Sequence, residues 1–390
     1  MPSSPRVQRH IIFLEELRRH SDREVCLGAA EYASERPAWA FDPWPITLAD
    51  GHAPALADLR MVHGILTTER SMREMPALRR RRIPLVYCLA DKPHADADAV
   101  SVDEPAVGAM AAEHLWDRGY RHFAFIGSTA TGWSQQRARG FSEWLDRTGS
   151  TPKICLFSQA DLPVFWSWNL AQRHARLLAL LAALPRPCGV FAANDVIACF
   201  VLQAARQIGR RVPEDFGVIG VDNDPVPNAA AGLAISSIEL PFREIGRAAA
   251  RLLHERWQGA APGRVVRLPP IRVIVRTSTD AFMAQNALVR KAQAYVEAHR
   301  QRRVTVAEVT RAVGTNRVTL GKHFQRELDA TLLDYIRRRR LAYAVECLRQ
   351  GHATVDEVAF TCGFSSASYF SRMLKTVTGR RPGAVRRGGG

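Results

Sequence analysis

Residues 305–328 read TVAEVTRAVGTNRVTLGKHFQREL, and residues 354–379 read TVDEVAFTCGFSSASYFSRMLKTVTG. In each stretch apolar residues recur at helical spacing on both sides of one glycine, Gly314 or Gly363, where the chain can turn sharply. This pattern predicts two helices held rigidly together so that the second projects, which is the helix-turn-helix arrangement. Two copies lie about 50 residues apart, and a long helix expected over Leu332–Leu348 joins them. We therefore expect an all-α C-terminal domain that binds double-stranded DNA.

The distribution of charge supports this expectation. The whole chain carries a formal net charge of +16. Residues 281–390 hold 20 Lys and Arg against 8 Asp and Glu, a surplus of +12, while residues 1–280 hold 34 against 30, a surplus of +4. A basic terminal segment is the electrostatic footprint of a nucleic-acid-binding module. A solvated basic tail would lack the regular apolar pattern that this segment has.

From residue 9 to about residue 279, short apolar runs alternate with longer stretches of helical period. The runs HFAFIG at 122–127 and FGVIGVD at 216–222 are typical of strands buried on both faces. Helices are expected between the runs, for example over Glu104–Arg118 and Asp195–Ile208. The alternation predicts an α/β fold with a parallel sheet covered by helices on both faces. The expected strands are His10–Leu14, Val62–Leu66, Pro84–Leu89, His122–Gly127, Ile154–Phe157, Gly189–Ala193 and Phe216–Val221.

Ligands of such sheets bind where the parallel strands end, so polar residues directly after strands are candidates for a binding site. Asn194 and Asp195 follow one run, and Asp222 follows another. Arg139 lies on the helix expected after HFAFIG. Helix capping, turn formation and a solvated helix charge are the structural alternatives for these residues. Together they predict a carboxylate–guanidinium–carboxylate set facing one cleft, which suits the hydroxyl groups of a sugar.

An aromatic ring commonly covers the apolar face of a bound sugar. Trp133, Trp166 and Trp168 are available for that contact. A place in the hydrophobic core is the alternative for each of them.

Five motifs in the first 279 residues resemble the sensor domains of lactose-repressor and ribose-binding proteins. They are VDEPAVGAMAAEHLWDRGYRHFAFIG, AANDVIA, VPEDFGVIGVDN, LPFREIGRAAARLL and VIVRTST, in the order of that family. The resemblance covers residues 9–279 and implies two Rossmann-like lobes, joined by a three-stranded hinge, that close on a sugar or similar solute. It places Asp195, Asp222 and Arg139 at positions that often contact ligand, and it adds Asp22 in the segment HSDREV. Lactose-type repressors carry an N-terminal helix-turn-helix, whereas here the first strand begins almost at once.

The C-terminal segment resembles the DNA-binding domain of AraC-type regulators. IRRRRLAYA matches the linker helix of that family, and VDEVAFTCGFSSASYFSRMLKTVTGRRPGAVR matches its second helix-turn-helix. Asp329 stands where the family usually has glycine, so the turn into the linker helix is expected to differ slightly.

Helical phase assigns roles within the two recognition helices. Leu320 and Phe324 should face inward in the first, and Phe370 and Leu374 in the second. Residues expected to face DNA are Arg317, Val318, Gly321, Lys322 and Gln325, and Ala367, Ser368, Ser371 and Arg372. Base readout is expected mainly from Arg317, Lys322, Ser368 and Arg372.

Basic residues outside that set have other expected roles. Lys375, Arg338 and Arg339 are expected to meet phosphates or solvent. Arg340 is expected to face inward and to tie the two helix-turn-helix subdomains together.

Sensor and DNA-binding parts in one chain predict a sugar-responsive regulator of transcription. The expected domains are a sensor over 1–279, a linker over 280–286 and a DNA-binding domain over 287–390. The likeness implies a pentose effector, D-xylose first, and activation of catabolic genes. Another sugar, or repression, is the alternative. A more distant alternative is a sugar-processing enzyme such as a glycoside hydrolase with Asp195 and Asp222 as acid and base, which would leave the basic domain unexplained.

The expected partners are operator DNA, the sugar effector, a second copy of the chain in a homodimer, and RNA polymerase. No cofactor and no metal site are expected, because the seven cysteines are scattered without ligand spacing. No signal segment opens the chain, and no apolar run approaches the roughly 18 residues that a membrane span needs. We therefore expect a cytoplasmic protein.

Overall fold

The computed structural model describes residues 9–15, 17–44, 61–68, 83–90, 95–158, 170–280, 284, 286–328, 330–350, 353–378 and 381–386. They form two compact units. The first, lobe 1, contains residues up to Asp103 together with Leu240–Pro270. The second contains Glu104–Glu239 and everything from Ile271 onward, which is a sheet-containing lobe 2 followed by a helical domain. The chain therefore passes between the units three times, the number of hinge strands that the resemblance implies.

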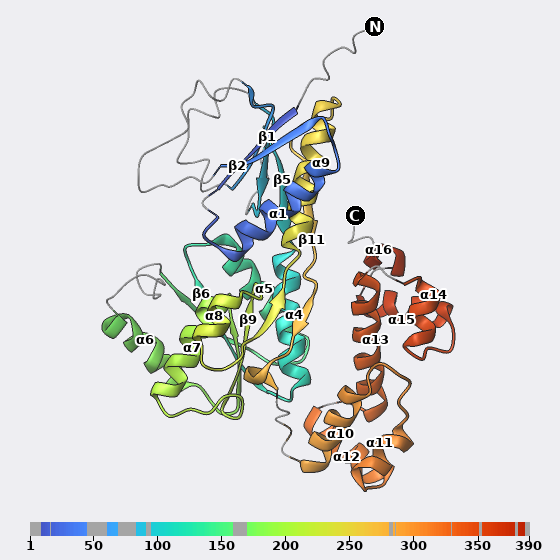
Figure 1. The fold of residues 1–390 in the computed structure, drawn as a ribbon. Helices are drawn as coiled ribbons and strands as arrows, with labels where there is room; N and C mark the ends of the chain where they lie inside the picture. Colours follow the sequence, from blue (N-terminus) through green and yellow to red (C-terminus); the bar gives the residue numbers. More distant parts are fainter. Residues whose placement is uncertain are drawn as a thin grey trace. The chain divides into compact units, whose positions relative to one another are not determined.

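Lobe 1 is built on a six-stranded sheet in the order β11-β5-β4-β3-β1-β2, with every neighbouring pair parallel. The strand between β3 and β2 carries the apolar run Ile11–Leu14, whose side chains are at most 1% exposed. Two helices, α1 (His20–Ser34) and α9 (Phe242–Trp257), pack on each other and on this sheet (Figure 1). The strands are β1 (Arg9–Leu14), β2 (Trp39–Trp44), β3 (Gly64–Thr67), β4 (Leu85–Cys88), β5 (Asp98–Val102) and β11 (Val265–Leu268).

Lobe 2 is built on a second six-stranded sheet in the order β12-β10-β9-β8-β6-β7. All its pairs are parallel except β10 with β12. The strands are β6 (His122–Ser128), β7 (Lys153–Phe157), β8 (Cys188–Ala192), β9 (Phe216–Val221), β10 (Ser236–Glu239) and β12 (Arg272–Ile274). The helices are α4 (Glu104–Asp117), α5 (Gly132–Asp146), α6 (Leu170–Ala183), α7 (Asp195–Gln207) and α8 (Pro225–Ala230).

All seven expected strands are confirmed to within a few residues. The sequence did not indicate β2, β5, β10, β11 and β12. The strand β10 is SSIE, whose two serines are fully buried, and β5 begins with the buried carboxylate Asp98. Such strands carry polar residues whose partners come from elsewhere in the fold, so no apolar run marks them.

Each lobe contains one helix pair at very short distance. A Cβ atom at Gly28 on α1 would lie 1.9 Å from the carbonyl oxygen of Arg243 on α9. A Cβ atom at Gly140 on α5 would lie 2.0 Å from the carbonyl oxygen of Pro105 on α4. Only glycine allows the two backbones to approach this closely, so each pair is fixed in one packing arrangement.

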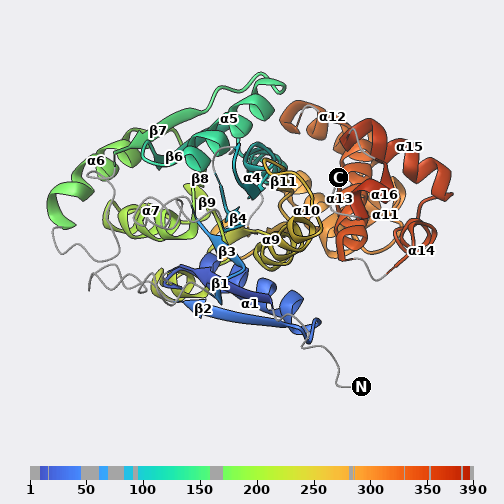
Figure 2. The same cartoon turned by 90° about the horizontal axis from the view of Figure 1, so that it is seen from above.

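The helical domain contains seven helices and no strand among its described residues, which agrees with the expected all-α domain. They are α10 (Ala287–Ala298), α11 (Val306–Val313), α12 (Arg317–Leu328), α13 (Leu332–Gln350), α14 (Val355–Thr361), α15 (Ala367–Thr378) and α16 (Pro382–Arg386). Figure 1 shows α10–α12 at one end of α13 and α14–α16 at the other, and Figure 2 shows all of them grouped around α13. Each end has its own hydrophobic core. The two helix-turn-helix units are therefore separate packing units that share one helix.

The two units also share their local chemistry. Thr305 with Glu308 and Thr354 with Glu357 form capping boxes at the first residues of α11 and α14. Gly314 and Gly363 follow these helices with φ of 75° and 71°, a left-handed conformation that favours glycine. The predicted double helix-turn-helix is confirmed.

Candidate effector site and nucleic-acid interface

Polar residues gather after β8 and β9 of lobe 2. Asn194 is the N-cap of α7, and its Oδ1 accepts a hydrogen bond from the Ile197 amide at 3.0 Å. Asp195 is 1% exposed; its Oδ1 accepts from the Ser237 hydroxyl at 2.7 Å and its Oδ2 from the Asp224 amide at 2.8 Å. The Asn194 side-chain oxygen therefore caps α7, which is the structural alternative named for this residue. Asp195 holds the loop that follows β9.

That loop has an unusual backbone. Asp222 and Asn223 have φ of 101° and 51°, which non-glycine residues adopt only when surrounding contacts hold them there. The contacts are present: the Asp222 amide donates to the Ile238 carbonyl, and the Asn223 amide donates to the Ser237 hydroxyl. The Asn223 side chain also accepts from Arg276. The strained loop therefore presents a half-buried Asp222 carboxylate next to the strand ends.

The two carboxylates of this region influence each other. Burial, followed by the negative charge of Asp222, raises the pKa of Asp195 well above its usual range. A pair of neighbouring acids with many acceptor lone pairs favours a ligand that brings hydroxyl donors. This arrangement suits a polyol better than an anion.

The guanidinium of this region comes from Arg137, and the expectation for Arg139 is wrong. The Arg139 side chain is 75% exposed and donates to Glu143 on the same helix at 2.6 Å. Arg137 is 4% exposed; it donates from Nε to Glu104 at 2.6 Å and from Nη1 to the Ala193 carbonyl, directly before Asn194, at 2.6 Å.

Helical phase explains why Arg137, and not Arg139, is the buried arginine of α5. Gly140 marks the side of α5 that packs on α4, and residues three apart lie on the same face of a helix. Arg137 is three residues before Gly140 and shares that face, whereas Arg139 is its immediate neighbour and does not. A glycine that marks a helix contact was the available signal in the sequence.

Of the candidate aromatic residues, Trp133 lies beside Arg137. It is half-buried in the first turn of α5, and the Arg137 guanidinium carbon is 4.7 Å from its ring centroid. This is a cation–π distance. Trp166 and Trp168 lie outside the described residues.

Lobe 1 has its own pair of buried carboxylates. Asp22 lies in the first turn of α1 and Glu15 directly after β1, and each is 6% exposed. Burial, and then the charge of Glu15, raises the pKa of Asp22 to about 6. The sequence analysis missed Glu15, although its position after the first strand follows the same rule that selected Asp222. Burial and these two carboxylates also raise the pKa of the Cys88 thiol, which makes it unreactive.

We predict that Asp22→Asn stabilises the sugar-free protein at pH 7 by up to about 3 kcal/mol, the free energy of a shift of this size. A carboxyl group whose pKa is raised by folding contributes stability below about pH 4, and that contribution is lost as the pH rises through about 6. The difference in free energy of unfolding between variant and wild type, from urea titrations, should therefore grow from pH 4 to pH 7. Asp146→Asn, at an exposed residue, is the control. A difference that does not change with pH would contradict this assignment.

We predict that Arg137→Gln lowers the free energy of unfolding by about 3–5 kcal/mol, because it leaves the Glu104 carboxylate buried without its charge partner. The matched variant Arg139→Gln, two residues away on the exposed side of α5, should leave stability unchanged within error. Urea denaturation of both variants measures the contrast. Equal effects of the two substitutions would show that Arg137 has no special structural role.

The first recognition helix, α12, has the expected phase. Leu320 and Phe324 are fully buried, while Arg317, Val318 and Lys322 are exposed. Gly321 is half-buried, and a Cβ atom there would meet no other atom within 4 Å, so the surface beside it is open. Gln325 and Arg326 are also exposed on this helix; the sequence analysis did not single out Arg326. Asp329 lies outside the described residues.

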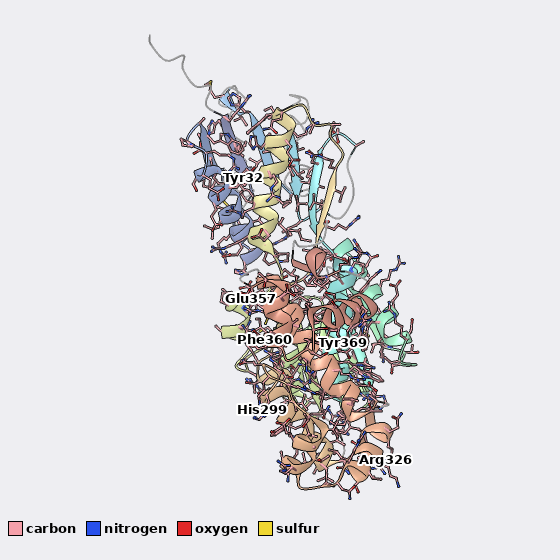
Figure 3. The ribbon with its side chains drawn as sticks, turned by 90° about the vertical axis from the view of Figure 1, so that its right-hand side faces the viewer. Tyr32, His299, Arg326, Glu357, Phe360 and Tyr369 are labelled. Carbon is pink, nitrogen blue, oxygen red and sulfur yellow. The ribbon has the colours of Figure 1, made fainter. Side chains whose placement is uncertain are left out.

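The second recognition helix, α15, follows the same pattern. Phe370 and Leu374 are fully buried, and Ser368, Arg372 and Lys375 are exposed. Ala367 and Ser371 are half-buried. Tyr369, which was not selected from the sequence, is 37% exposed; Figure 3 shows its side chain, together with that of Arg326 on α12.

Of the basic residues of α13, Arg340 behaves as expected and Arg339 does not. Arg340 donates to the Val304 carbonyl of the first subdomain at 3.2 Å and to the Gly363 carbonyl of the second at 3.4 Å, so it does tie the two together. Arg338 is exposed. Arg339 was expected to meet phosphate or solvent, but its side chain is 14% exposed and donates to Asp117 and Glu297. This expectation is wrong because the partner Asp117 lies 222 residues away in the chain.

Two features are absent from the part of the chain that the structure describes. No group of three or more His, Cys, Asp or Glu side chains there could hold a metal ion. No described helix combines the length and apolar character needed to cross a membrane.

Comparison with known families places both parts of the chain. Residues 112–279 match the periplasmic binding protein-like domain, and residues 309–388 match a helix-turn-helix domain, here of the AraC type. The chain is thus a helix-turn-helix transcription regulator with a sugar-binding type of sensor domain.

Individual relatives align with this chain over almost its whole length. The xylose operon regulatory protein of Haemophilus influenzae is 27% identical over 365 residues, covering 91% of this chain and 92% of that protein. The corresponding protein of Escherichia coli K12 is 27% identical over 387 residues, covering 96% of each. A solved structure described as a xylose-binding transcription activator aligns with a TM-score of 0.59 and 25% identity over 98% of both chains.

Proposed function

We propose that the protein is a cytoplasmic activator of pentose catabolic genes and that D-xylose is its effector. The similarity to xylose operon regulatory proteins over both domains carries this proposal. The proposed domains are a sensor over 1–279, a linker over 280–286 and a DNA-binding domain over 287–390. A homodimer would bind paired operator sites and contact RNA polymerase at the promoter.

The proposed effector site combines residues of several strand ends. In lobe 2, Asp222 accepts from sugar hydroxyls, Arg137 supplies donors and Trp133 covers the apolar sugar face. Asp22 of lobe 1 is a further proposed acceptor for sugar hydroxyls. Asn194 and Asp195 hold the loops around the ligand. Arg137 replaces Arg139 in this set, because the Arg137 guanidinium is the one beside the end of β8.

The geometry favours binding of a ligand over catalysis of its hydrolysis. A hydrolase would need Asp195 and Asp222 as a free acid and base on opposite sides of a bond. Asp195 is 1% exposed, and both of its oxygens accept hydrogen bonds from the protein. We therefore assign Asp195 a structural role and propose no catalytic function.

In the proposed DNA complex the two recognition helices enter successive major grooves, about one helical turn apart on one face of the duplex. Arg317, Val318, Gly321 and Lys322 of α12 would meet one half of the site. Ala367, Ser368, Ser371 and Arg372 of α15 would meet the other, with Lys375 on a phosphate.

We predict that D-xylose, at about 100–1,000 times its dissociation constant, stabilises the full chain by about 3–4 kcal/mol. Thermal shift measurements with D-xylose, L-arabinose, D-ribose and D-glucose test this. Asp222→Asn should remove most of the shift, whereas Arg139→Gln should keep it. No response to any of these sugars, or a larger response to glucose, would contradict the choice of effector.

We predict opposite signatures for two neighbouring substitutions on α15. Arg372→Ala should reduce discrimination between operator and mutated operator by about 1–3 kcal/mol, the contribution of a bidentate base contact. Lys375→Ala should weaken binding to both duplexes equally and reduce the slope of log K against log salt by about 1. Fluorescence anisotropy with the full chain over a salt series measures both. Unchanged discrimination in Arg372→Ala would refute its assignment to base readout.

A further inference from the structure

Helix α4 makes polar contacts at both ends. At its first residue, Glu104 accepts from Arg137 at 2.6 Å, and Arg137 in turn binds the Ala193 carbonyl beside the candidate effector site. At its last residue, Asp117 accepts from Arg339 of the helical domain at 3.0 Å. With 14 residues the helix is about 20 Å long. One rigid element thus connects the end of β8 with the DNA-binding part of the same unit.

The packing of α4 lets it move only as a body. Val107, Ala111, Ala112 and Leu115 are fully buried. A Cβ atom at Gly108 would lie 2.1 Å from the Arg137 carbonyl oxygen on α5. Contacts this close are not continuously deformable, so a displacement at Glu104 is carried to Asp117.

The contact at the far end is a largely buried group of charges centred on Arg339, with Arg118 and Arg300 beside it. Arg339 of α13 donates to Asp117 of α4 and, at 2.7 and 2.9 Å, to Glu297 of α10. The side chains of Arg339 and Asp117 are 14% and 12% exposed. Burial opposes the charge of Arg339, but the two carboxylates outweigh it and raise its pKa.

Two further hydrogen bonds cross between the same elements. Gln293 of α10, fully buried, donates to the Asp117 carbonyl at 3.0 Å. Arg121, which stacks on Trp116, donates to the carbonyl of Glu327 in the last turn of the recognition helix α12 at 3.0 Å. The end of α4 and the segment after it therefore contact α10, α12 and α13.

The two carboxylates of the cluster come from different parts of the second unit. Glu297 belongs to the helical domain itself, whereas Asp117 belongs to lobe 2. When Asp117 moves away, Arg339 keeps Glu297 as its partner and is not left as an unpaired buried charge, the situation that makes most broken buried ion pairs so unfavourable. The contact can therefore open and close.

We propose that α4 couples the effector site to the DNA-binding domain and that Asp117, Arg339 and Glu297 form the latch between them. Occupancy of the site moves Arg137 and Glu104, α4 transmits the movement, and the latch repositions α13 and the two recognition helices. The proposal rests on the proposed function in one respect, namely that a sugar binds beside Arg137.

The test measures the coupling itself in the full chain. In wild type, saturating D-xylose should change the Kd for operator DNA by a factor within the usual range of about 5–150, and DNA should change the Kd for D-xylose by the same factor. Asp117→Asn keeps the shape and removes the charge, so both factors should fall to within about twofold of 1. The separate affinities for DNA and for sugar should remain. Glu143→Gln, in the exposed pair on α5, is the matched control and should keep the wild-type factor.

A second variant and a sugar-free measurement keep the test decisive. Arg339→Lys retains the charge but loses the guanidinium fork that donates to the two carboxylates from separate nitrogens, so it should reduce the coupling factor in the same direction even if Asp117→Asn folds poorly. Hydrogen exchange without sugar should be several-fold faster along α10 in Asp117→Asn than in wild type. Unchanged coupling or unchanged exchange would overturn the latch. If D-xylose does not bind to the wild-type chain, the proposed effector is contradicted instead. The hydrogen-exchange rates along α10, measured without sugar, would then still test the latch.

Discussion

A single buried guanidinium, that of Arg137, joins the parts of lobe 2 on which the rest depends. It connects α5, which carries it, with the first residue of α4 and with the backbone at the end of β8. A charge that is 4% exposed is tolerated only when it is fully paired, so these three elements must keep their relative positions. The ends of the strands, where a ligand is expected, are thereby fixed to the helix that reaches the DNA-binding part.

Several groups near the strand ends are held in states that are unfavourable without a ligand. The pKa values of Asp22 and Asp195 are raised by burial beside another carboxylate. Asp222 and Asn223 have left-handed backbone conformations that only the surrounding hydrogen bonds maintain. Violations of local rules concentrate at functional sites because function, not stability, selects them.

The DNA-binding part solves a different physical problem, which is to present two recognition helices with fixed spacing. Each helix-turn-helix has its own core and its own capping box, so each is rigid by itself. The shared helix α13 sets the spacing, and Arg340 binds the backbone of both subdomains. Its neighbour Arg339 faces the other way, into the contact with α4. Arg340 thus holds the two subdomains together, while the adjacent Arg339 connects the helical domain to α4.

The sequence by itself determined the elements whose signal is local. Apolar runs marked β1, β3, β4, β6, β7, β8 and β9. Helical phase identified Leu320, Phe324, Phe370 and Leu374 as buried and Arg340 as a residue that ties the two subdomains together. Only the tertiary structure decided which arginine of α5 faces the strand ends and where Arg339 is bound. The reason is that the direction of a side chain on a helix depends on the spacing of nearby residues. The partner of a buried charge, such as Asp117 for Arg339, depends on how distant segments pack.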